Sequence, residues 1–486
     1  MSLKRKIAIN TLAQFIGRGL NIVLAAVTIS FVTRILQPEK YGFYTIALTI
    51  LSLVALFADF GAYGNLVRDL SQTNDEKKFK QLYGSVFSFR LVWALLIYSI
   101  SGIVIFFLNV DPIVKAAFAI LSISSFFSSL NSLLIVILQV RYRMTWAVVG
   151  DVLNRLCMFG LLIWILFAKL DFYFVFWAGS AASIINFLFV FFFVRKSFAF
   201  TFKWPKSLII EFAKNSVLLG LASLLGVVHF RIDTIILSIG HSAKDVGIYG
   251  VAYKIFETGI FLPAVFVGMM MPSFSQSCGA ADQTRFQALL QKTFDCLALM
   301  VFPIATVLFW SASWIIQVMG GKEYMNAALP LYILAFALIP NFLCSIFSIA
   351  FVSAKKLKSL ILAVLIYLLI DAPVVFLLVW QWSYIGAAIS TVFSEVITIV
   401  IMLIFSKKIL NFIPKFAIVF RLLPVAIFSN IIAFLFCFSV KDFTLNIQNS
   451  LISVTLLLVL VVGAYSIWLI KSRLVSFNKL RPRFNF

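Results

Sequence analysis

The chain has 486 residues, of which 63% are hydrophobic and only 12% are charged, and its mean hydropathy is +1.07. Soluble proteins carry about 25% charged residues, so this composition excludes a soluble globular domain of ordinary kind. The net charge of +22 would suit a nucleic-acid-binding protein, but the basic residues lie in short breaks between long apolar stretches, which argues against nucleic acid as a partner.

The apolar stretches are long enough to cross a bilayer and follow one another with short breaks. A transmembrane barrel would show segments of about ten residues that alternate in polarity. The pattern therefore predicts an all-α polytopic membrane protein with about 14 transmembrane helices. Their expected residues are 7–36, 41–68, 81–108, 113–140, 146–168, 172–194, 207–239, 244–274, 288–312, 327–353, 358–380, 384–406, 415–438 and 450–470.

An internal repeat relates the two halves of the chain with an offset of 205 residues. Identical pairs at this offset include Asn10 and Asn215, Gly42 and Gly247, Tyr44 and Tyr249, and Ala47 and Ala252. Six spans per copy is an even number, so the sequence predicts two six-helix lobes related by a pseudo-two-fold axis along the membrane normal. We expect domains at 1–200 and 201–410, followed at 411–486 by two further helices and a basic tail.

The placement of Lys and Arg predicts the orientation of these helices. With the N-terminus in the cytoplasm, the cytoplasmic connections and tails carry 24 Lys and Arg residues and the opposite connections carry 6. Cytoplasmic loops are enriched in these residues, so both termini are expected in the cytoplasm of a bacterial inner-membrane protein. The basic loops are also expected to contact anionic lipids.

The sequence offers little for enzymatic chemistry. It has no phosphate-binding Gly-rich loop that ends in Lys-Ser or Lys-Thr, and its two histidines have no zinc spacing. Its five cysteines are scattered and are expected to be packing residues. No connection is long enough to form a soluble domain. We therefore expect no enzyme activity, no cofactor and no metal site.

A polar stripe marks the first predicted span. Asn10, Gln14, Arg18 and Asn21 fall on one narrow face of the helix at about 100° per residue. Ionisable groups within a bilayer are costly and commonly mark cavities or pathways. The stripe therefore predicts a water-filled cavity that binds a substrate. The alternative for Arg18 is a structural pair with a carboxylate such as Asp59.

The second copy carries related candidates. Its expected cavity residues are Asn215, Arg231 and Lys254, and the excess of basic groups favours a phosphate-bearing ligand. Candidate coupling-ion sites are the intramembrane acids Asp59, Asp233, Glu257 and Glu395. Structural alternatives remain open, since Lys254 can pair with Glu257 on one helix face, Arg231 with Glu257, or Asp233 with Lys254. Arg90 is expected to extend to the cytoplasmic surface.

Residues 10–14, 33–42, 59–61 and 66–68 resemble bacterial oligosaccharide flippases. These are the Wzx-type O-antigen and exopolysaccharide branch of the multidrug/oligosaccharidyl-lipid/polysaccharide (MOP) exporter superfamily. The likeness extends over the chain in its size, short loops and basic tails. It implies two lobes around a central cavity that opens alternately to either side of the membrane.

The resemblance also implies a cargo, an oligosaccharide linked to undecaprenyl diphosphate that moves from the inner to the outer leaflet. In such families a basic residue early in the chain and another on the eighth helix contact the head group, and Arg18 and Lys254 stand at matching places. Polysaccharide polymerase machinery is an expected partner. Helices beyond the twelfth occur in the branch that flips lipid II, where they help to form a groove for the lipid tail.

Two other functions compete with this interpretation. A cation-coupled multidrug antiporter of the same superfamily would favour an acidic cavity, whereas the most central charge predicted here is Arg18. A membrane glycan polymerase or ligase would need a sizeable extramembrane region, which the short connections do not provide.

Overall fold

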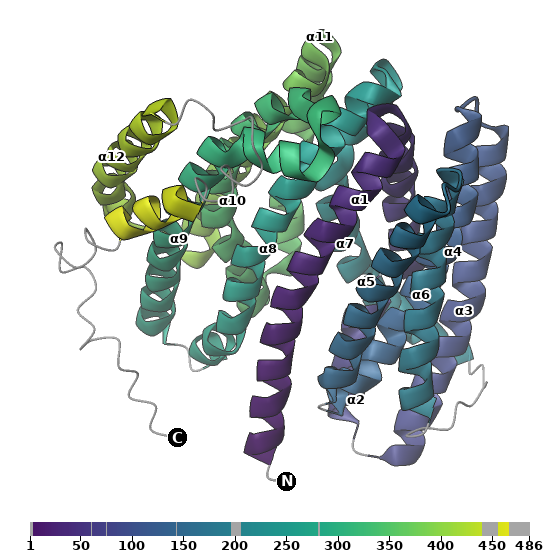
Figure 1. Cartoon of the computed structure of the whole chain (residues 1–486). Coiled ribbons are helices and arrows are strands. Elements are labelled where there is room, and N and C mark those ends of the chain that lie inside the picture. Colours follow the sequence, from purple (N-terminus) through teal and green to yellow (C-terminus); the bar gives the residue numbers. More distant parts are fainter. Residues whose placement is uncertain are drawn as a thin grey trace. The chain divides into compact units, whose positions relative to one another are not determined.

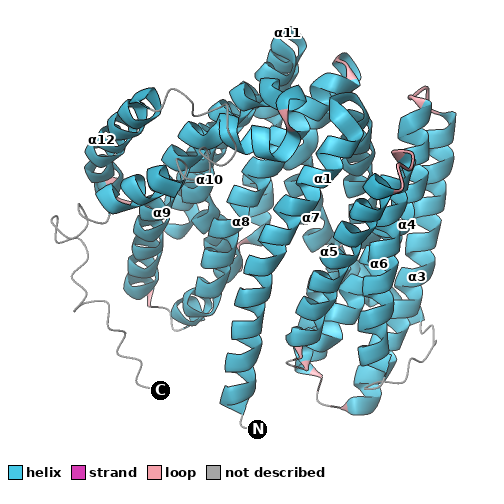
Figure 2. Cartoon of the chain, in the orientation of Figure 1, coloured by secondary structure: helices cyan, strands magenta, loops and turns pink. Residues whose placement is uncertain are grey.

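The computed structural model of the protein describes residues 3–59, 61–73, 75–141, 143–195, 206–279, 282–439 and 455–465. Inside the helices, it leaves out the side chains of residues 3–16, 18, 62, 68, 206–216, 218, 219, 272, 279 and 437–439. All regular structure in the described residues is helical, as Figure 2 shows. The predicted all-α membrane class is confirmed.

The helices follow the apolar stretches of the sequence. Their bounds are α1 (Leu3–Asp59), α2 (Ala62–Gln72), α3 (Glu76–Phe107), α4 (Pro112–Val140), α5 (Met144–Phe167), α6 (Tyr173–Arg195), α7 (Lys206–Gly240), α8 (Ala243–Gly279), α9 (Gln283–Gly320), η1 (Lys322–Ala327), α10 (Ala328–Ser353), α11 (Leu357–Phe405), η2 (Ser406–Leu410), α12 (Ala417–Ser439) and a short helix at Thr455–Tyr465. Asp75 and Asp111 cap α3 and α4 by accepting hydrogen bonds from the backbone N–H groups of Lys77 and Ile113.

Eleven helices within the described residues are long and apolar enough to cross a membrane. Two of them contain a sharp break, at Gln37 in α1 (φ 57°, ψ 168°) and at Ser383 in α11 (φ 49°, ψ −132°). The sequence predicts a turn between two spans at each of these places. A straight α1 of 57 residues would measure ~86 Å, against a hydrocarbon core of ~30 Å. Each broken helix is long enough for two spans, and the total of fourteen stays a prediction.

The chain divides into two compact units, Met1–Gly250 and Val251–Phe486. In the first unit, α1 packs against α4, α5 and α7, and α6 packs against α4 and α5 (Figure 1). In the second unit, α10 packs between α9 and α11, and α12 packs against α9. The boundary between the units falls within α8. The domain limits at 200 and 410 and the two-lobe symmetry stay predictions.

Packing inside the first unit combines apolar clusters with hydrogen bonds between helices. Leu66, Phe79, Leu134 and Val190 belong to a cluster that joins α2, α3, α4 and α6. The hydroxyls of Ser124 and Ser183 lie 2.6 Å apart and join α4 to α6. Small polar residues allow helices to approach closely where lipid offers no hydrophobic driving force.

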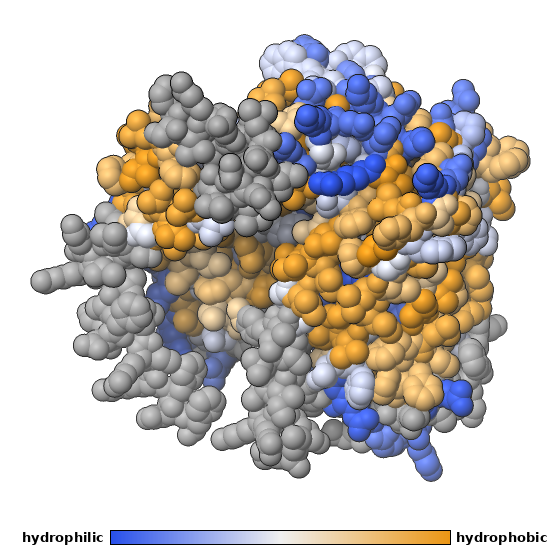
Figure 3. Space-filling view, viewed as in Figure 1, coloured by the Kyte–Doolittle hydropathy of each residue, from blue (hydrophilic) through white to orange (hydrophobic). Residues whose placement is uncertain are grey.

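The outward face of the helices is apolar. Phe106, Phe107 and Phe167 are 70%, 81% and 85% exposed, as are many other large hydrophobic side chains. Figure 3 shows hydrophobic residues across the middle of the visible helices and hydrophilic residues gathered toward their ends. So large an apolar surface marks contact with lipid. The protein is a multi-span membrane protein.

Candidate functional site

The predicted cavity face of α1 is described in part. The side chains of Asn10, Gln14 and Arg18, and of Asn215 on α7, lie outside the described residues, so their roles stay predictions. Asn21 is half-buried, and its Oδ1 atom has no hydrogen-bond partner among the described residues. A buried amide oxygen without a partner is costly. Asn21 therefore places a buried polar atom on the face where the sequence places Arg18.

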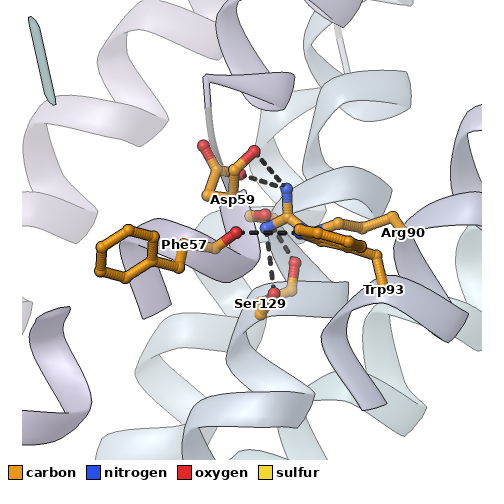
Figure 4. Close-up of polar contacts among 6 residues, drawn as sticks. Phe57, Asp59, Arg90, Trp93 and Ser129 are labelled. Carbon is orange, nitrogen blue, oxygen red and sulfur yellow. Dashed lines mark hydrogen bonds and ion pairs between the residues drawn. The ribbon is translucent and has the colours of Figure 1, made fainter. Parts of the chain in front are cut away.

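Asp59 forms an ion pair with Arg90 of α3. The Arg90 Nη1 atom lies 2.7 Å from Asp59 Oδ1, and the side chains are 3% and 30% exposed respectively. Nη1 also donates to the Asp59 carbonyl oxygen at 2.9 Å, and Nη2 donates to Ser129 Oγ on α4 at 3.0 Å. Figure 4 shows the guanidinium between these partners. The expectation that Arg90 extends to the surface was wrong, because Arg90 is buried and joins three elements.

This cluster holds the end of α1. The last carbonyl groups of a helix have no partner within it, and a nearby cation or N–H group stabilises them. Arg90 fills that role at Asp59, and the indole Nε1 of Trp93 donates to the Phe57 carbonyl oxygen at 2.9 Å (Figure 4). Gly61 follows in the left-handed conformation (φ 75°) and precedes α2. The Asp59–Arg90 pair therefore has a structural role that sequence analysis did not assign to it.

Asp233 is buried in α7 at 5% exposure. It accepts hydrogen bonds from the Tyr249 hydroxyl at the start of α8, from the backbone N–H of Thr234 at 2.6 Å and from the Thr234 hydroxyl at 3.2 Å. Arg231, two residues earlier, is half-buried. The repeat marks Tyr249, but no pattern in the sequence indicates its contact with Asp233, because sixteen residues and the turn between α7 and α8 separate the two residues.

Lys254 and Glu257 on α8 pair with each other, which is one of the alternatives that the sequence left open. Lys254 Nζ lies 2.7 Å from Glu257 Oε2, and the side chains are 45% and 36% exposed. Exposed pairs three or four residues apart stabilise a helix by about 0.2–0.5 kcal/mol, so this pair contributes little to the stability of the helix. Both side chains are partly exposed.

The second unit contains two buried carboxylates. Glu395 is 2% exposed and accepts a hydrogen bond from Asn341 Nδ2 of α10 at 2.9 Å. Asp371 is fully buried and accepts from the Ser394 hydroxyl, which joins the two halves of α11. Among the described residues, no three His, Cys, Asp or Glu side chains are grouped as a metal site requires.

An apolar cavity of about 540 Å³ lies among α9, α10 and α12 of the second unit. Phe302, Phe309, Phe336 and Ile427 are among its lining residues. Its polar side is Asn430, which accepts a hydrogen bond from Trp310 Nε1 at 2.8 Å. Such a cavity suits a hydrocarbon chain better than a sugar or an ion.

The fold, the apolar surface and the buried ionisable groups together define a polytopic helical membrane transporter. Residues 3–278, more than half of the chain, match the polysaccharide biosynthesis protein family, and residues 219–377 match the MatE family. The chain belongs to the polysaccharide biosynthesis protein family, within the MOP exporter superfamily. The predicted family membership is confirmed.

Solved structures show the same fold. The structure of the lipid II flippase MurJ in an inward closed conformation is 16% identical, with a TM-score of 0.75 over 96% of this chain and 100% of that chain. An inward-facing multidrug resistance MATE transporter is 12% identical, with a TM-score of 0.66 over 80% and 94% of the two chains.

A MOP transporter from Pyrococcus furiosus, described as having a binding pocket of reverse polarity, is 14% identical, with a TM-score of 0.60 over 84% and 96% of the two chains. At these identities the likeness concerns the fold alone. No curated protein sequence matches the chain.

Proposed function

We propose that this protein is a flippase for an undecaprenyl-diphosphate-linked oligosaccharide repeat unit. It would move this unit by alternating access from the inner to the outer leaflet of the bacterial cytoplasmic membrane, for assembly of O-antigen or exopolysaccharide. The observation that carries the proposal is the family match over residues 3–278, a stretch that includes the polar stripe with Arg18. The fold likeness to a lipid II flippase adds support.

The cargo has a polar head and a long hydrocarbon tail, and the chain offers different groups to each. Arg18, Arg231 and Lys254 supply cationic groups for a diphosphate, and Asn21 supplies an amide for sugar hydroxyls. The apolar cavity among α9, α10 and α12 accommodates part of an isoprenoid tail. The head would cross through the protein while the tail stays in an apolar environment.

The energy source is either the membrane potential acting on an anionic cargo or exchange for protons or sodium ions. Asp59 forms an ion pair with Arg90, and Glu257 forms one with Lys254. Asp233 and Glu395 are buried within the helices, and the donors of their hydrogen bonds include a tyrosine hydroxyl and an amide. We therefore favour Asp233 and Glu395 as coupling-ion sites.

A multidrug antiporter is the second candidate, because residues 219–377 match the MatE family. An antiporter for organic cations requires acidic groups that face its cavity. Asp59 instead forms an ion pair with Arg90. Asp233 and Glu395 accept hydrogen bonds from other groups of the protein. These contacts favour the flippase.

The deciding experiment uses a strain from which the gene is deleted. Undecaprenyl-diphosphate-linked glycans are extracted, and their leaflet is determined with a membrane-impermeant glycan-modifying reagent. A flippase predicts complete repeat units that accumulate in the inner leaflet and return to the outer leaflet on complementation. Normal exposure of the units in the deletion strain would reject the proposal and favour the antiporter.

A separate assay of the purified protein tests the third function. Lengthening of the glycan by the purified protein would indicate a polymerase.

A further inference from the structure

The helix α5 exposes two different faces. Its exposed apolar side chains lie within an arc of about 80° around the helix axis and include Trp146, Val149, Leu156 and Trp164. An exposed face of this kind is in contact with lipid. Asp151 and Arg155 are also exposed, but they lie on the opposite side of the helix, about 160° from the centre of the apolar arc.

The depth of these two charges limits what they can face. Arg155 lies eleven residues after the first residue of α5 and twelve before the last, so it is near the middle of a membrane span. A charge at this depth is costly in lipid and is found where it faces the protein interior or water. Because the lipid face of α5 lies on the other side, Asp151 and Arg155 face a part of the protein that water can reach.

The two charges do not pair with each other. Residues four apart on a helix can form an ion pair, but the described part of the chain shows none between Asp151 and Arg155. The N–H groups of the Arg155 guanidinium also have no hydrogen-bond acceptor among the described residues. The pair is therefore not explained by stabilisation of α5 alone.

Asn186 of α6 orients the carboxylate. Its side chain is 7% exposed, and its Nδ2 atom donates to Asp151 Oδ1 at 3.4 Å. Gly150 makes room for this amide, because a Cβ atom there would lie 2.5 Å from Asn186 Oδ1. That amide oxygen has no hydrogen-bond partner among the described residues. The contact fixes one oxygen of Asp151 and leaves Oδ2 without a donor in this part of the chain.

The first helix runs alongside α5. A Cβ atom on Gly17 would lie 1.9 Å from the Cγ1 atom of Val148, so the two helices are in close contact there. Further along both helices, the rings of Phe31 and Phe159 meet with centroids 5.2 Å apart. Because residue numbers rise in the same direction from the first contact to the second, α1 and α5 are parallel.

Asn21 therefore lies at the level of Asp151. Asn21 is four residues beyond Gly17 in α1, and Asp151 is three residues beyond the matching contact in α5. Asn21 is also only about 40° from Gly17 around the helix, so it is on the side of α1 that meets α5. Together, Asn21, Asp151, Arg155 and Asn186 form a polar cluster from three helices, which we call the α5 polar cluster.

The charges of the α5 polar cluster favour a neutral polar ligand. The carboxylate of Asp151 would repel a phosphate, and the guanidinium of Arg155 would repel an organic cation. A sugar hydroxyl suits both groups, since it donates to a carboxylate and accepts from a guanidinium. A sugar whose hydroxyls point elsewhere would leave these charged groups without partners, which is a strong basis for discrimination.

We propose that the α5 polar cluster binds an uncharged sugar of the cargo and selects the glycan that the protein carries. Asp151 and Arg155 contact the hydroxyl groups, and Asn186 is a positioning residue that orients Asp151. This assignment rests on the proposed function for its cargo. It concerns the sugar and not the diphosphate, which is the ligand proposed for Arg18.

Binding of two lipids to the purified protein tests the proposal. One probe is the undecaprenyl-diphosphate-linked glycan extracted from the deletion strain, and the other is undecaprenyl diphosphate without sugar. Asp151→Asn and Arg155→Gln should each weaken binding of the glycan-bearing lipid about tenfold or more, because each loses a charge-assisted hydrogen bond. Both variants should bind the sugar-free lipid as the wild type does. Arg18→Ala should instead weaken binding of both lipids.

An exchange of the two charges separates sugar binding from a structural role. Asp151→Arg/Arg155→Asp keeps both charges on one face of α5, yet it should bind the glycan-bearing lipid as weakly as the single variants. Normal binding by the exchange variant would overturn the proposal and make the two residues a structural pair. Arg141→Gln is the control, because the exposed pair of Arg141 and Glu76 joins α3 to α4, and it should bind both lipids normally.

The wild type provides a measurement that needs no substitution. It should bind the glycan-bearing lipid about tenfold more tightly than the sugar-free lipid, as contacts with the sugar require. Equal affinities, or variants that lose both lipids to the same extent or lose neither, would overturn the sugar assignment and leave the flippase standing. A wild type that binds neither lipid would reject the proposed cargo, and this assignment with it.

Discussion

At the scale of residues, the partners of charged groups depend on helix rotation as well as on sequence position. Asp59 and Arg90 are separated by 31 residues, yet they form a buried pair because α3 turns Arg90 toward the end of α1. The sequence offered Arg18 as an alternative partner for Asp59, and it contained no signal that would prefer Arg90. The pair of Lys254 and Glu257 could be predicted, since both lie on one face of one helix.

Removal of Arg90 should destabilise the protein strongly. Loss of one member of a buried pair costs about 3–5 kcal/mol, and we expect the lower end for Arg90→Ala because Asp59 is 30% exposed. The melting temperature in detergent measures the effect. Arg141→Ala is the matched control, since the Arg141–Glu76 pair is 37% and 58% exposed and should contribute less than about 1 kcal/mol. Equal losses in both variants would contradict the structural role of Arg90.

Arg18 is expected to act on transport and not on folding. Arg18→Ala should abolish movement of the lipid-linked glycan while membrane insertion stays normal, because the proposed cavity would lose its central cation. Arg18→Lys should keep part of the activity, since it keeps the charge without the planar guanidinium. Leaflet exposure of the glycan and the amount of protein in the membrane are the two measurements. Wild-type transport by the alanine variant would rule out the cavity assignment.

At the scale of elements, the sequence predicted where long helices break but not how. The gap between the predicted spans 7–36 and 41–68 indicated the turn in α1, and the gap between 358–380 and 384–406 indicated the turn in α11. The structure places the breaks on single residues with positive φ, Gln37 and Ser383. Neither residue type signals that conformation, because the surrounding contacts impose it.

Gln37→Gly should therefore stabilise the protein. Gln37 has φ 57° and ψ 168°, a region that is almost restricted to glycine and costs other residues about 1–3 kcal/mol. Glycine removes this cost but loses more conformational entropy on folding than glutamine does. The net effect should raise the free energy of unfolding by about 1 kcal/mol. The control Gln81→Gly lies in the interior of α3 and should lower stability by about 1 kcal/mol. A lower melting temperature for Gln37→Gly would contradict the strain at this break.

At the scale of the whole molecule, composition was sufficient to predict the class of the protein, whereas the two-lobe architecture drawn from the internal repeat stays a prediction. The all-helical membrane fold was predictable because it depends on a pattern that extends over hundreds of residues, and the superfamily was predictable from short segments within residues 10–68. The compact units could not be predicted from the sequence, because their boundary within α8 reflects packing between helices and not a polar linker.

The orientation in the membrane gives a prediction at this scale. In a cysteine-free background, Asn109→Cys between α3 and α4 should react with an impermeant maleimide in intact cells, because its connection belongs to the predicted outer set. Lys78→Cys, exposed near the start of α3, should react only after the membrane is permeabilised. The reverse pattern would invert the orientation.

A Cβ atom on Gly42 would lie 1.7 Å from the carbonyl oxygen of Ala243, and one on Gly247 would lie 1.9 Å from that of Pro38, so two turns related by the offset of 205 residues pack backbone to backbone. This reciprocal contact has a consequence for the ancestry of the chain. If the two halves of the chain are exchanged, the same contact results. The contact therefore uses features that both halves share and none that is present in one half only. Two separate polypeptides, each with one copy of the repeat, could make it unchanged as a symmetric dimer. The geometry of this contact therefore does not depend on the fusion of the two copies, and it is compatible with a half-length ancestor that paired with itself.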